Sequence, residues 1–274
     1  MQKLSIITIN LNNAKGLKKT IDSVIYQTFK DFDYIIIDGS STDGSLDVIK
    51  SYTDIPPGLY EPRITNHESR ISYWISSHDT GIYNAMNKGI KQAKGEYLLF
   101  LNSGDWFINN DVLKECFQTN FQENIAYGYQ LEERCGSIIV PPSLDVEYIT
   151  FRTLKRSHIP HQCTFIRKEL FEKYGYYSEE YQIISDWAFI MKCLFLNTCS
   201  IKRLPVNMTV YDTNGISSTT DFKQLQEKER RSFLEKNFPL FMPDYDYFEQ
   251  FMNKNYMKFI LKLRKIINTL MFKK

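Results

Sequence analysis

Short apolar runs alternate with helix-like segments over the first 106 residues, and this alternation constrains the fold more than any other feature. The apolar runs read as buried strands at residues 4–9, 34–37, 73–76 and 97–101. Between the last two, residues 82–93 place apolar side chains along one helical face. Buried strands joined by crossover helices are typical of a parallel sheet covered by helices. The sequence therefore predicts an α/β protein with a mostly parallel sheet.

Polar or acidic residues follow each of these predicted strands. Asn10 follows the first strand, Asp38 ends the second, Asp79 lies shortly after the third, and residues 102–105 follow the fourth. Ligands of open α/β sheets bind outside the carboxyl ends of the strands. We therefore expect a binding site at this edge, although each acid taken alone could equally cap the helix that follows it.

The turn Asn102-Ser103-Gly104-Asp105 is the clearest candidate at this edge. Gly104 lets the backbone turn sharply after a buried strand. An aspartate here suits a divalent cation, and such a cation suits a phosphorylated substrate. Asn102 is the other side chain of the turn that could bind such a cation. The position of Asp105 among other polar strand ends favours a ligand over a helix cap.

The second half offers one further acid and a pair of histidines. Asp186 lies in the first turn of a helix predicted within residues 181–195, beside Trp187. Partial desolvation there would raise its pKa and suit a general base, whereas the alternative is a helix cap. His158 and His161 have no third ligand at a zinc-like spacing, so we expect this loop to hold phosphate or acceptor hydroxyls.

Composition and missing motifs exclude several classes of protein. The chain has 43% hydrophobic and 24% charged residues, as is ordinary for a globular protein. Five scattered cysteines, an odd number without a CxxC pair, indicate reduced thiols. Neither a secretory signal nor a spanning apolar segment is present, so we expect a cytoplasmic protein. Absence of GxSxG, GxxxxGK[ST] and GxGxxG disfavours serine hydrolases, phosphate-loop kinases and dinucleotide dehydrogenases.

The net charge of +2 conceals an asymmetry along the chain. Residues 250–274 contain seven basic residues and no acid, which leaves 27 basic against 32 acidic residues elsewhere, near −5. A uniformly basic nucleic-acid binder is therefore disfavoured. The tail has the pattern of a basic amphipathic helix, which suits an anionic membrane surface. Packing of its apolar side on protein is the alternative.

Together these segments resemble the family 2 glycosyltransferases, which have the GT-A fold, over residues 3–217. The resemblance is carried by Thr8-Ile9-Asn10 and by the segments IIIDGSSTDGS, HDTGIYNAMNKGIKQAKGEYLLFLNSGD and IPHQCTFIRKELFEKYGYYSEEYQIISDW. Two elements depart from the family pattern. Its Asp-x-Asp element is reduced here to the 102–105 turn with one carboxylate, and its acidic pair is here Ser185-Asp186.

The resemblance implies a Rossmann-like, mostly parallel sheet flanked by helices, with Asp186 as catalytic base and Asp105 as ligand of Mn²⁺ or Mg²⁺. It also implies that residues 214–217 form a mobile loop over the donor. His161 and Gln162 are expected on the acceptor or phosphate side. The expected contacts to the nucleotide-sugar donor are Thr8, Asn10, Asp38, Asp79, Asn87, Asn102, Ser103 and Gly104.

The expected organisation is a GT-A domain over residues 1–220, divided into a nucleotide-binding half (1–106) and an acceptor half (107–220). Residues 221–274 are expected to form a helical extension. The resemblance implies an inverting glycosyltransferase that moves a sugar from a nucleotide-diphosphate donor, a UDP-sugar, to a glycan or lipid-linked acceptor in cell-surface polysaccharide synthesis. The resemblance also implies a peripheral position at the inner face of the cell membrane, because such transferases often build lipid-linked sugars there. The alternative is a sugar-nucleotide-binding or scaffold protein with weak catalysis.

Overall fold

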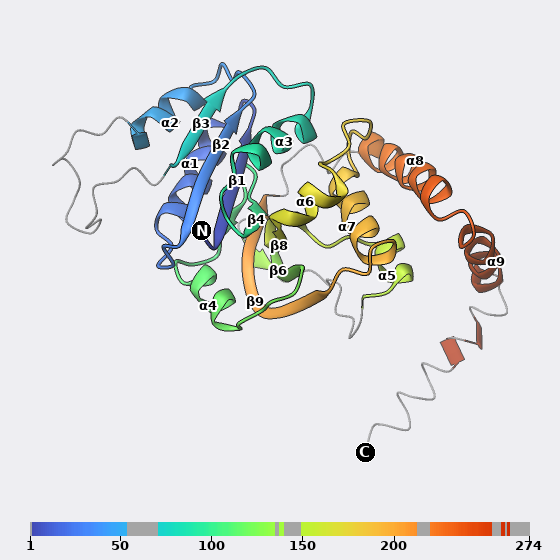
Figure 1. Cartoon of the computed structure of the whole chain (residues 1–274). Helices are drawn as coiled ribbons and strands as arrows, with labels where there is room; N and C mark the ends of the chain where they lie inside the picture. Colours follow the sequence, from blue (N-terminus) through green and yellow to red (C-terminus); the bar gives the residue numbers. More distant parts are fainter. Residues whose placement is uncertain are drawn as a thin grey trace. The chain divides into compact units, whose positions relative to one another are not determined.

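The computed structural model describes residues 2–53, 71–134, 137–139, 149–212, 220–253, 259–260 and 262–263 (Figure 1). The chain forms two compact units, Met1–Lys223 and Gln224–Lys274. The predicted loop 214–217 and most of the basic tail lie outside the described residues.

Four parallel strands form the first half of the sheet, as the sequence predicted. Their order is β3-β2-β1-β4, and every pairing between them is parallel. The strands are β1 (Leu4–Asn10), β2 (Phe32–Asp38), β3 (Tyr73–Ser76) and β4 (Tyr97–Phe100). The helices that connect them are α1 (Ala14–Ile25), α2 (Ser45–Thr53) and α3 (Ile82–Gln92).

The sheet continues beyond β4 with mixed direction, in the order β4-β8-β6-β9-β5. Only the β6–β9 pairing in this half is parallel, and β7 pairs with β6 at the side. The strands are β5 (Trp106–Phe107), β6 (Ile125–Arg134), β7 (Ser137–Ile139), β8 (Thr164–Arg167) and β9 (Ile201–Asp212). The helices are α4 (Val112–Gln118), α5 (Phe151–Arg156), α6 (Lys168–Tyr174) and α7 (Ser185–Phe195), with a short 3₁₀ turn at His161–Cys163.

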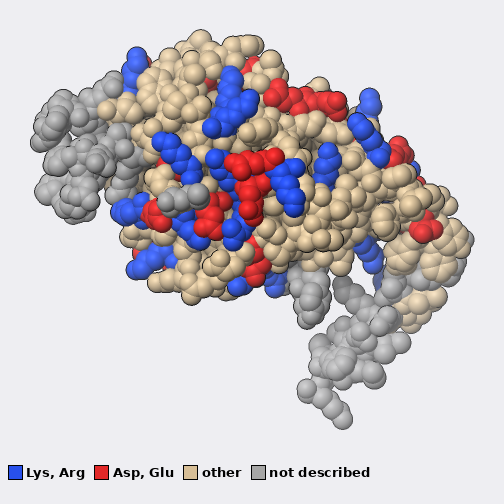
Figure 2. All heavy atoms as spheres, viewed as in Figure 1, with Lys and Arg blue, Asp and Glu red and all other residues tan. Residues whose placement is uncertain are grey.

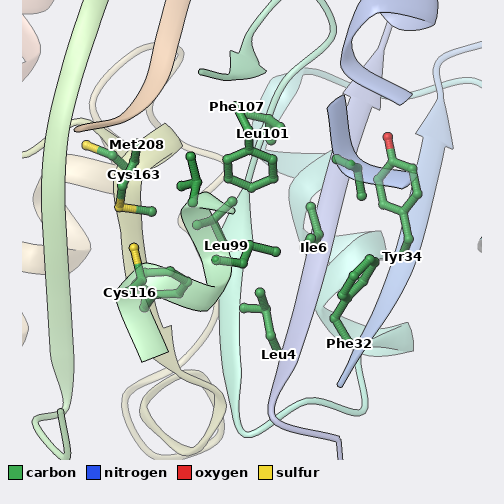
Figure 3. Packing of buried hydrophobic residues seen from close by; sticks show 14 of the residues in the cluster. Leu4, Ile6, Phe32, Tyr34, Leu99, Leu101, Phe107, Cys116, Cys163 and Met208 are labelled. Atoms are coloured by element: carbon green, nitrogen blue, oxygen red, sulfur yellow. The ribbon is translucent and has the colours of Figure 1, made fainter. Parts of the chain in front are cut away.

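The apolar runs of the sequence form a continuous core under the sheet (Figure 3). Every residue of β1, β2 and β4 is buried, as expected for central strands covered on both faces. The cluster runs from Ile6 and Tyr34 through Leu99 to Cys163 and Met208, so it joins the parallel half to the mixed half. One core therefore fixes the strand ends at which the candidate site lies.

Helix α3 lies close against β1 because residue 89 is a glycine. A methyl group on Gly89 would overlap the side chain of Ile7. Overpacking of this kind costs about 1–3 kcal/mol. The close approach sets the position of the side chains at the start of α3, several of which contact the candidate site.

The second unit contains α9 (Met242–Asn253) and most of α8 (Thr220–Asn237). Arg231 of α8 donates two hydrogen bonds of 2.7 Å to Asp246 of α9, which ties the two helices together. Within the described part of the chain, no helix is both long and apolar enough to cross a membrane. On the face shown in Figure 2, basic and acidic side chains are interspersed.

Candidate active site

The candidate site lies where the strand order reverses between β1 and β4. The Thr8 hydroxyl donates to the carbonyl of Leu101 at 2.7 Å, and the Ser103 N–H donates to the carbonyl of Ile9 at 3.1 Å. These bonds bring the end of β1 next to the turn that follows β4. Ligands of doubly wound sheets bind at such a reversal. Thr8 is fully buried, so its hydroxyl holds these two strands together.

Asp38 organises the edge of the sheet at the end of β2. Its carboxylate accepts hydrogen bonds from Asn10 Nδ2 at 2.8 Å, from Ser41 Oγ at 2.6 Å and from Ser76 Oγ at 2.6 Å. Burial raises the pKa of Asp38, but these hydrogen bonds outweigh it and hold the pKa below its usual value. Asp38 therefore stays ionised and fixes the ends of three strands. The Asn10 Oδ1 atom is buried and has no partner among the described residues.

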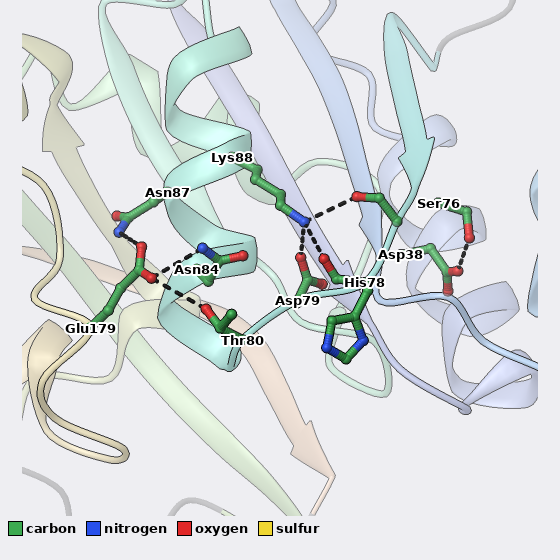
Figure 4. A network of polar contacts seen from close by, with 10 residues as sticks. Asp38, Ser76, His78, Asp79, Thr80, Asn84, Asn87, Lys88 and Glu179 are labelled. Carbon is green, nitrogen blue, oxygen red and sulfur yellow. Dashed lines mark hydrogen bonds and ion pairs between the residues drawn. The ribbon is translucent and has the colours of Figure 1, made fainter.

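Asp79 lies beside the turn that follows Asp38 and is paired with a lysine (Figure 4). Lys88 of α3 contacts Asp79 Oδ1 and donates to the carbonyl of His78 at 2.8 Å. A Cβ atom on Gly39 would lie 3.1 Å from Asp79 Oδ2, so the glycine leaves that carboxylate room. The structure thus brings Asn10, Asp38 and Asp79 to one edge of the sheet.

The turn after β4 depends on the conformational freedom of Gly104. Its φ of +108° is a left-handed value that a residue with a side chain rarely adopts. The Gly104 N–H donates to Thr20 Oγ1 at 3.0 Å, and the Ser103 carbonyl accepts from Asn13 Nδ2 at 3.0 Å. Thr20 lies in the middle of α1 and Asn13 caps its N-terminus, so the first crossover helix holds this turn in place.

Asp105 lies inside the protein behind this turn, with only 4% of its surface exposed. Its Oδ1 accepts from the backbone N–H of Asp212 at 3.1 Å, and the Gln162 side chain donates to the same carboxylate. Burial raises the pKa of Asp105 to about 6, although these hydrogen bonds and the nearby His161 oppose the rise. The structure therefore brings Asp105 and Gln162 together, as the sequence placed them in one site.

His161 joins the 102–105 turn to the predicted base. Its Nε2 lies 3.0 Å from Asn102 Nδ2, and its Nδ1 lies 3.1 Å from Asp186 Oδ2. On the other side, the Tyr83 hydroxyl of α3 donates to Asp186 Oδ1 at 2.8 Å. Asn102, His161, Asp186 and Tyr83 thus form one chain of contacts that crosses the site. The Asn102 Oδ1 atom is buried and has no partner in the described part of the molecule.

The expected raised pKa of Asp186 is wrong. Burial does raise it, but the hydrogen bond and positive charge of His161, together with the Tyr83 hydroxyl, lower the pKa to about 2. The sequence placed Asp186 beside aromatic residues and missed these two polar partners. The carboxylate is therefore ionised at neutral pH and fixed on both oxygens.

Asn87 lies away from these clusters and connects α3 to the segment before α7. Its amide donates to the Tyr177 carbonyl at 2.9 Å and accepts from the Tyr177 N–H at 3.1 Å. Glu179 accepts from Asn87 at 3.1 Å, from Asn84 at 3.0 Å and from Thr80 at 3.3 Å (Figure 4). The expected contact of Asn87 with the donor stays a prediction. In the structure both ends of this amide already bond to the backbone of Tyr177, which holds α3 against the segment before α7.

Sequence reasoning missed three residues that shape the site. Tyr83 was visible on the predicted helix, but its contact with Asp186 joins positions 103 residues apart. Glu179 lies in a polar loop segment with no recognisable pattern. Asp212 ends β9, a strand that was not predicted because charged residues and a proline interrupt its apolar pattern.

Among the described residues, no group of three His, Cys, Asp or Glu side chains could hold a metal ion by itself. The side chains near the turn that offer oxygen ligands are two carboxylates and one amide, from Asp105, Asp212 and Asn102. Mg²⁺ and Mn²⁺ sites of nucleotide enzymes commonly use one or two carboxylates, with phosphate oxygens and water completing the shell. These residues therefore fit a cation that arrives with a diphosphate.

The chain matches the family model described as glycosyl transferase family 2 over residues 5–175. It is 30% identical over 229 residues to a PGL/p-HBAD biosynthesis glycosyltransferase of Mycobacterium bovis, a match that covers 82% of each chain. The same values hold for a protein of that name from Mycobacterium tuberculosis.

Two solved structures share the fold. S. aureus TarS in complex with UDP-GlcNAc superposes with a TM-score of 0.62 at 20% identity, over 85% of this chain and 71% of that one. The mannosyltransferase PcManGT from Pyrobaculum calidifontis, in complex with GDP-Man and Mn²⁺, superposes with a TM-score of 0.57 at 13% identity. This match covers 77% of this chain and 56% of that one. The fold is thus GT-A, and the chain is a glycosyltransferase that belongs to glycosyl transferase family 2.

Proposed function

We propose that this glycosyltransferase inverts the anomeric centre of a nucleotide-diphosphate sugar, most simply a UDP-sugar, in a single displacement. The observation that carries the proposal is the fixed, ionised carboxylate of Asp186. The His161 ring bridges Asp186 and Asn102, and Asn102 belongs to the turn at which we place the donor diphosphate. A base on one side of a sugar and a leaving diphosphate on the other is the arrangement that a single inversion needs.

In this mechanism Asp186 accepts the proton of an acceptor hydroxyl as that oxygen attacks the anomeric carbon. The bond from the anomeric carbon to the diphosphate oxygen breaks in the same step, and its electron pair leaves with the diphosphate. Tyr83 and His161 hold the Asp186 carboxylate in orientation, so little reorganisation is needed. A cation bound at the turn would supply charge stabilisation for the leaving group.

The donor side rests on the edge formed by Asn10, Asp38 and Asp79. The buried Oδ1 atoms of Asn10 and Asn102 support a polar ligand here, because buried acceptors in native proteins nearly always have a partner. The complexes of TarS with UDP-GlcNAc and of PcManGT with GDP-Man support a nucleotide-sugar donor. For the acceptor we propose a glycan or a lipid-linked glycan of the cell surface.

Replacement of the base tests the proposal directly. Asp186→Asn keeps the side-chain shape but removes the proton acceptor, so transfer should fall by about 10²–10⁴-fold. Binding of UDP or GDP, measured by calorimetry, should stay within about twofold of the unchanged protein, a difference below 0.5 kcal/mol. Asp47→Asn, on the exposed first turn of α2, is the matched control.

A screen of UDP-, GDP- and dTDP-sugars for hydrolysis and transfer identifies the donor to be used in this test. Retention of more than about a tenth of turnover in Asp186→Asn would remove Asp186 from the role of base. Nucleotide binding without hydrolysis or transfer by the unchanged protein would support the alternative role of a sugar-nucleotide-binding protein. Anomeric configuration of the product, read by NMR, decides between inversion and retention.

A further inference from the structure

The end of β9 brings a carboxylate to the place where the 102–105 turn lacks one. A Cβ atom built on Gly104 would lie 3.5 Å from Asp212 Oδ2 and 3.6 Å from Asp212 Cβ. The Asp212 side chain therefore lies beside Gly104, next to the Asn13 amide nitrogen, which would be 3.3 Å from the same Cβ atom. The turn itself contains one acid, Asp105, and a strand more than a hundred residues further on brings a second carboxylate beside it.

Asp105 and Asp212 differ in how far they are enclosed by the protein. Asp105 is 4% exposed, and its carboxylate already accepts hydrogen bonds from Gln162 and from the Asp212 backbone. Asp212 is only half-buried and follows Val210, which pairs with Trp106 directly after the turn. The more accessible carboxylate at this turn is thus the one from β9.

We propose that Asp212 supplies the carboxylate that contacts the divalent cation of the donor diphosphate, while Asp105 holds the backbone of Asp212 in place from behind. This inference rests on the proposed function, because it concerns the cation that would accompany the donor. It moves the main metal contact from Asp105 to Asp212.

The chemistry of the remaining donors agrees with this assignment. The buried Asn102 Oδ1 atom, which has no partner in the described part of the chain, is a second oxygen at the same turn. One carboxylate and one amide oxygen leave most of the coordination shell to phosphate oxygens and water, as is usual for Mg²⁺ with nucleotides. Such a site binds the cation weakly alone and better when the diphosphate is present.

Direct measurement of Mn²⁺ binding tests the assignment independently of turnover. Electron paramagnetic resonance counts unbound Mn²⁺ in titrations of the full chain, without nucleotide and with saturating UDP or GDP. We expect Asp212→Asn to weaken Mn²⁺ binding in the presence of nucleotide at least about tenfold, because a charged ligand is lost. Asp212→Glu, which keeps the charge, should retain more of the binding than Asp212→Asn.

The matched variant is Asp105→Asn, whose Oδ1 can still accept from the Asp212 N–H. If Asp105 acts from behind, Mn²⁺ affinity should change by only about twofold to threefold, under 0.7 kcal/mol. The reverse order of effects, with Asp105→Asn losing binding and Asp212→Asn keeping it, would overturn the inference. So would Asp212→Asn retaining full Mn²⁺ affinity.

Different results would contradict the role of Asp212 in cation binding and the proposed sugar transfer. If the unchanged protein binds nucleotide and transfers sugar without taking up Mn²⁺, the role of Asp212 is refuted while the proposed transfer stands. Circular dichroism of each variant confirms its fold. If Asp212→Asn does not fold, the comparison of Asp212→Glu with Asp105→Asn decides.

Discussion

His161 is the residue on which the geometry of the base depends most. The Asn102 amide nitrogen lies 3.0 Å from its Nε2, and its Nδ1 lies 3.1 Å from the Asp186 carboxylate, to which an N–H at Nδ1 donates. This arrangement fixes both the ring and the carboxylate. It also connects the base to the 102–105 turn through a single side chain.

Replacement of His161 should change the pH dependence of transfer. In His161→Ala the Asp186 carboxylate stays buried but loses the hydrogen bond that lowers its pKa most, so we expect its pKa to rise by about one to three pH units from the value of about 2. In the proposed mechanism activity requires ionised Asp186, so a higher pKa of Asp186 means that activity is lost at higher pH as the solution is acidified. The acid limb of kcat, measured from pH 8 downward, should therefore move upward.

His78→Ala is the control for this prediction, because His78 is exposed at the same edge of the sheet. An unchanged pH profile in His161→Ala, with the same loss of kcat at every pH, would show that His161 does not set the pKa of Asp186.

At the scale of elements, α3 contacts both sides of the site. Lys88 pairs with Asp79 on one side, whereas Tyr83, Asn84 and Asn87 contact the segment that leads into α7 and Asp186. A shift of α3 would therefore move Asp186 and Asp79 together. The close packing of Gly89 on β1 opposes such a shift.

Asn87 and Asn84 give a matched pair of variants on this helix. Asn87→Ala should lower the free energy of unfolding by about 2–4 kcal/mol, because it leaves the buried Tyr177 N–H and carbonyl without a partner. Asn84→Ala removes one bond to the exposed Glu179 and should cost under about 1 kcal/mol. Urea denaturation of both variants measures the difference, and equal losses would contradict this account.

The elements that the sequence predicted are those with strong periodicity. Runs such as residues 4–9 and 34–37 are apolar because both faces of each strand are covered, and this is visible without a structure. The strands β8 and β9 are shorter or interrupted by polar residues, so the sequence did not predict these two strands of the mixed half. The pKa of Asp186 could not be predicted from the sequence either, because only the tertiary fold brings His161 and Tyr83 next to it.

At the scale of the whole molecule, charge divides between the body of the chain and its tail. Residues 250–274 carry seven basic groups and no acid, whereas the rest has 27 basic and 32 acidic residues. Long-range attraction to an anionic surface would therefore come from the tail. A lipid-linked acceptor would make such attraction useful, because it would hold the site near its substrate.

Vesicle co-sedimentation checks this prediction on the full chain. We expect binding to vesicles with about 30% anionic lipid at low salt and much weaker binding at about 0.5 M NaCl, because salt screens exposed charges. Replacement of the four lysines Lys254, Lys258, Lys262 and Lys265 by glutamine should weaken binding at low salt. Absence of binding in both conditions would favour packing of the tail on protein.

The contact between Asp105 and the backbone of Asp212 joins positions 107 residues apart, and β5 is paired with β9 at the same place. A ribosome adds about 5–20 residues per second, so this span takes roughly 5–20 s to synthesise. During that interval a nascent chain displays the complete 102–105 turn without the strand that closes it. The two carboxylates at this turn therefore come together late in translation, and a product that stops before residue 212 contains the 102–105 turn without the strand that brings the second of them.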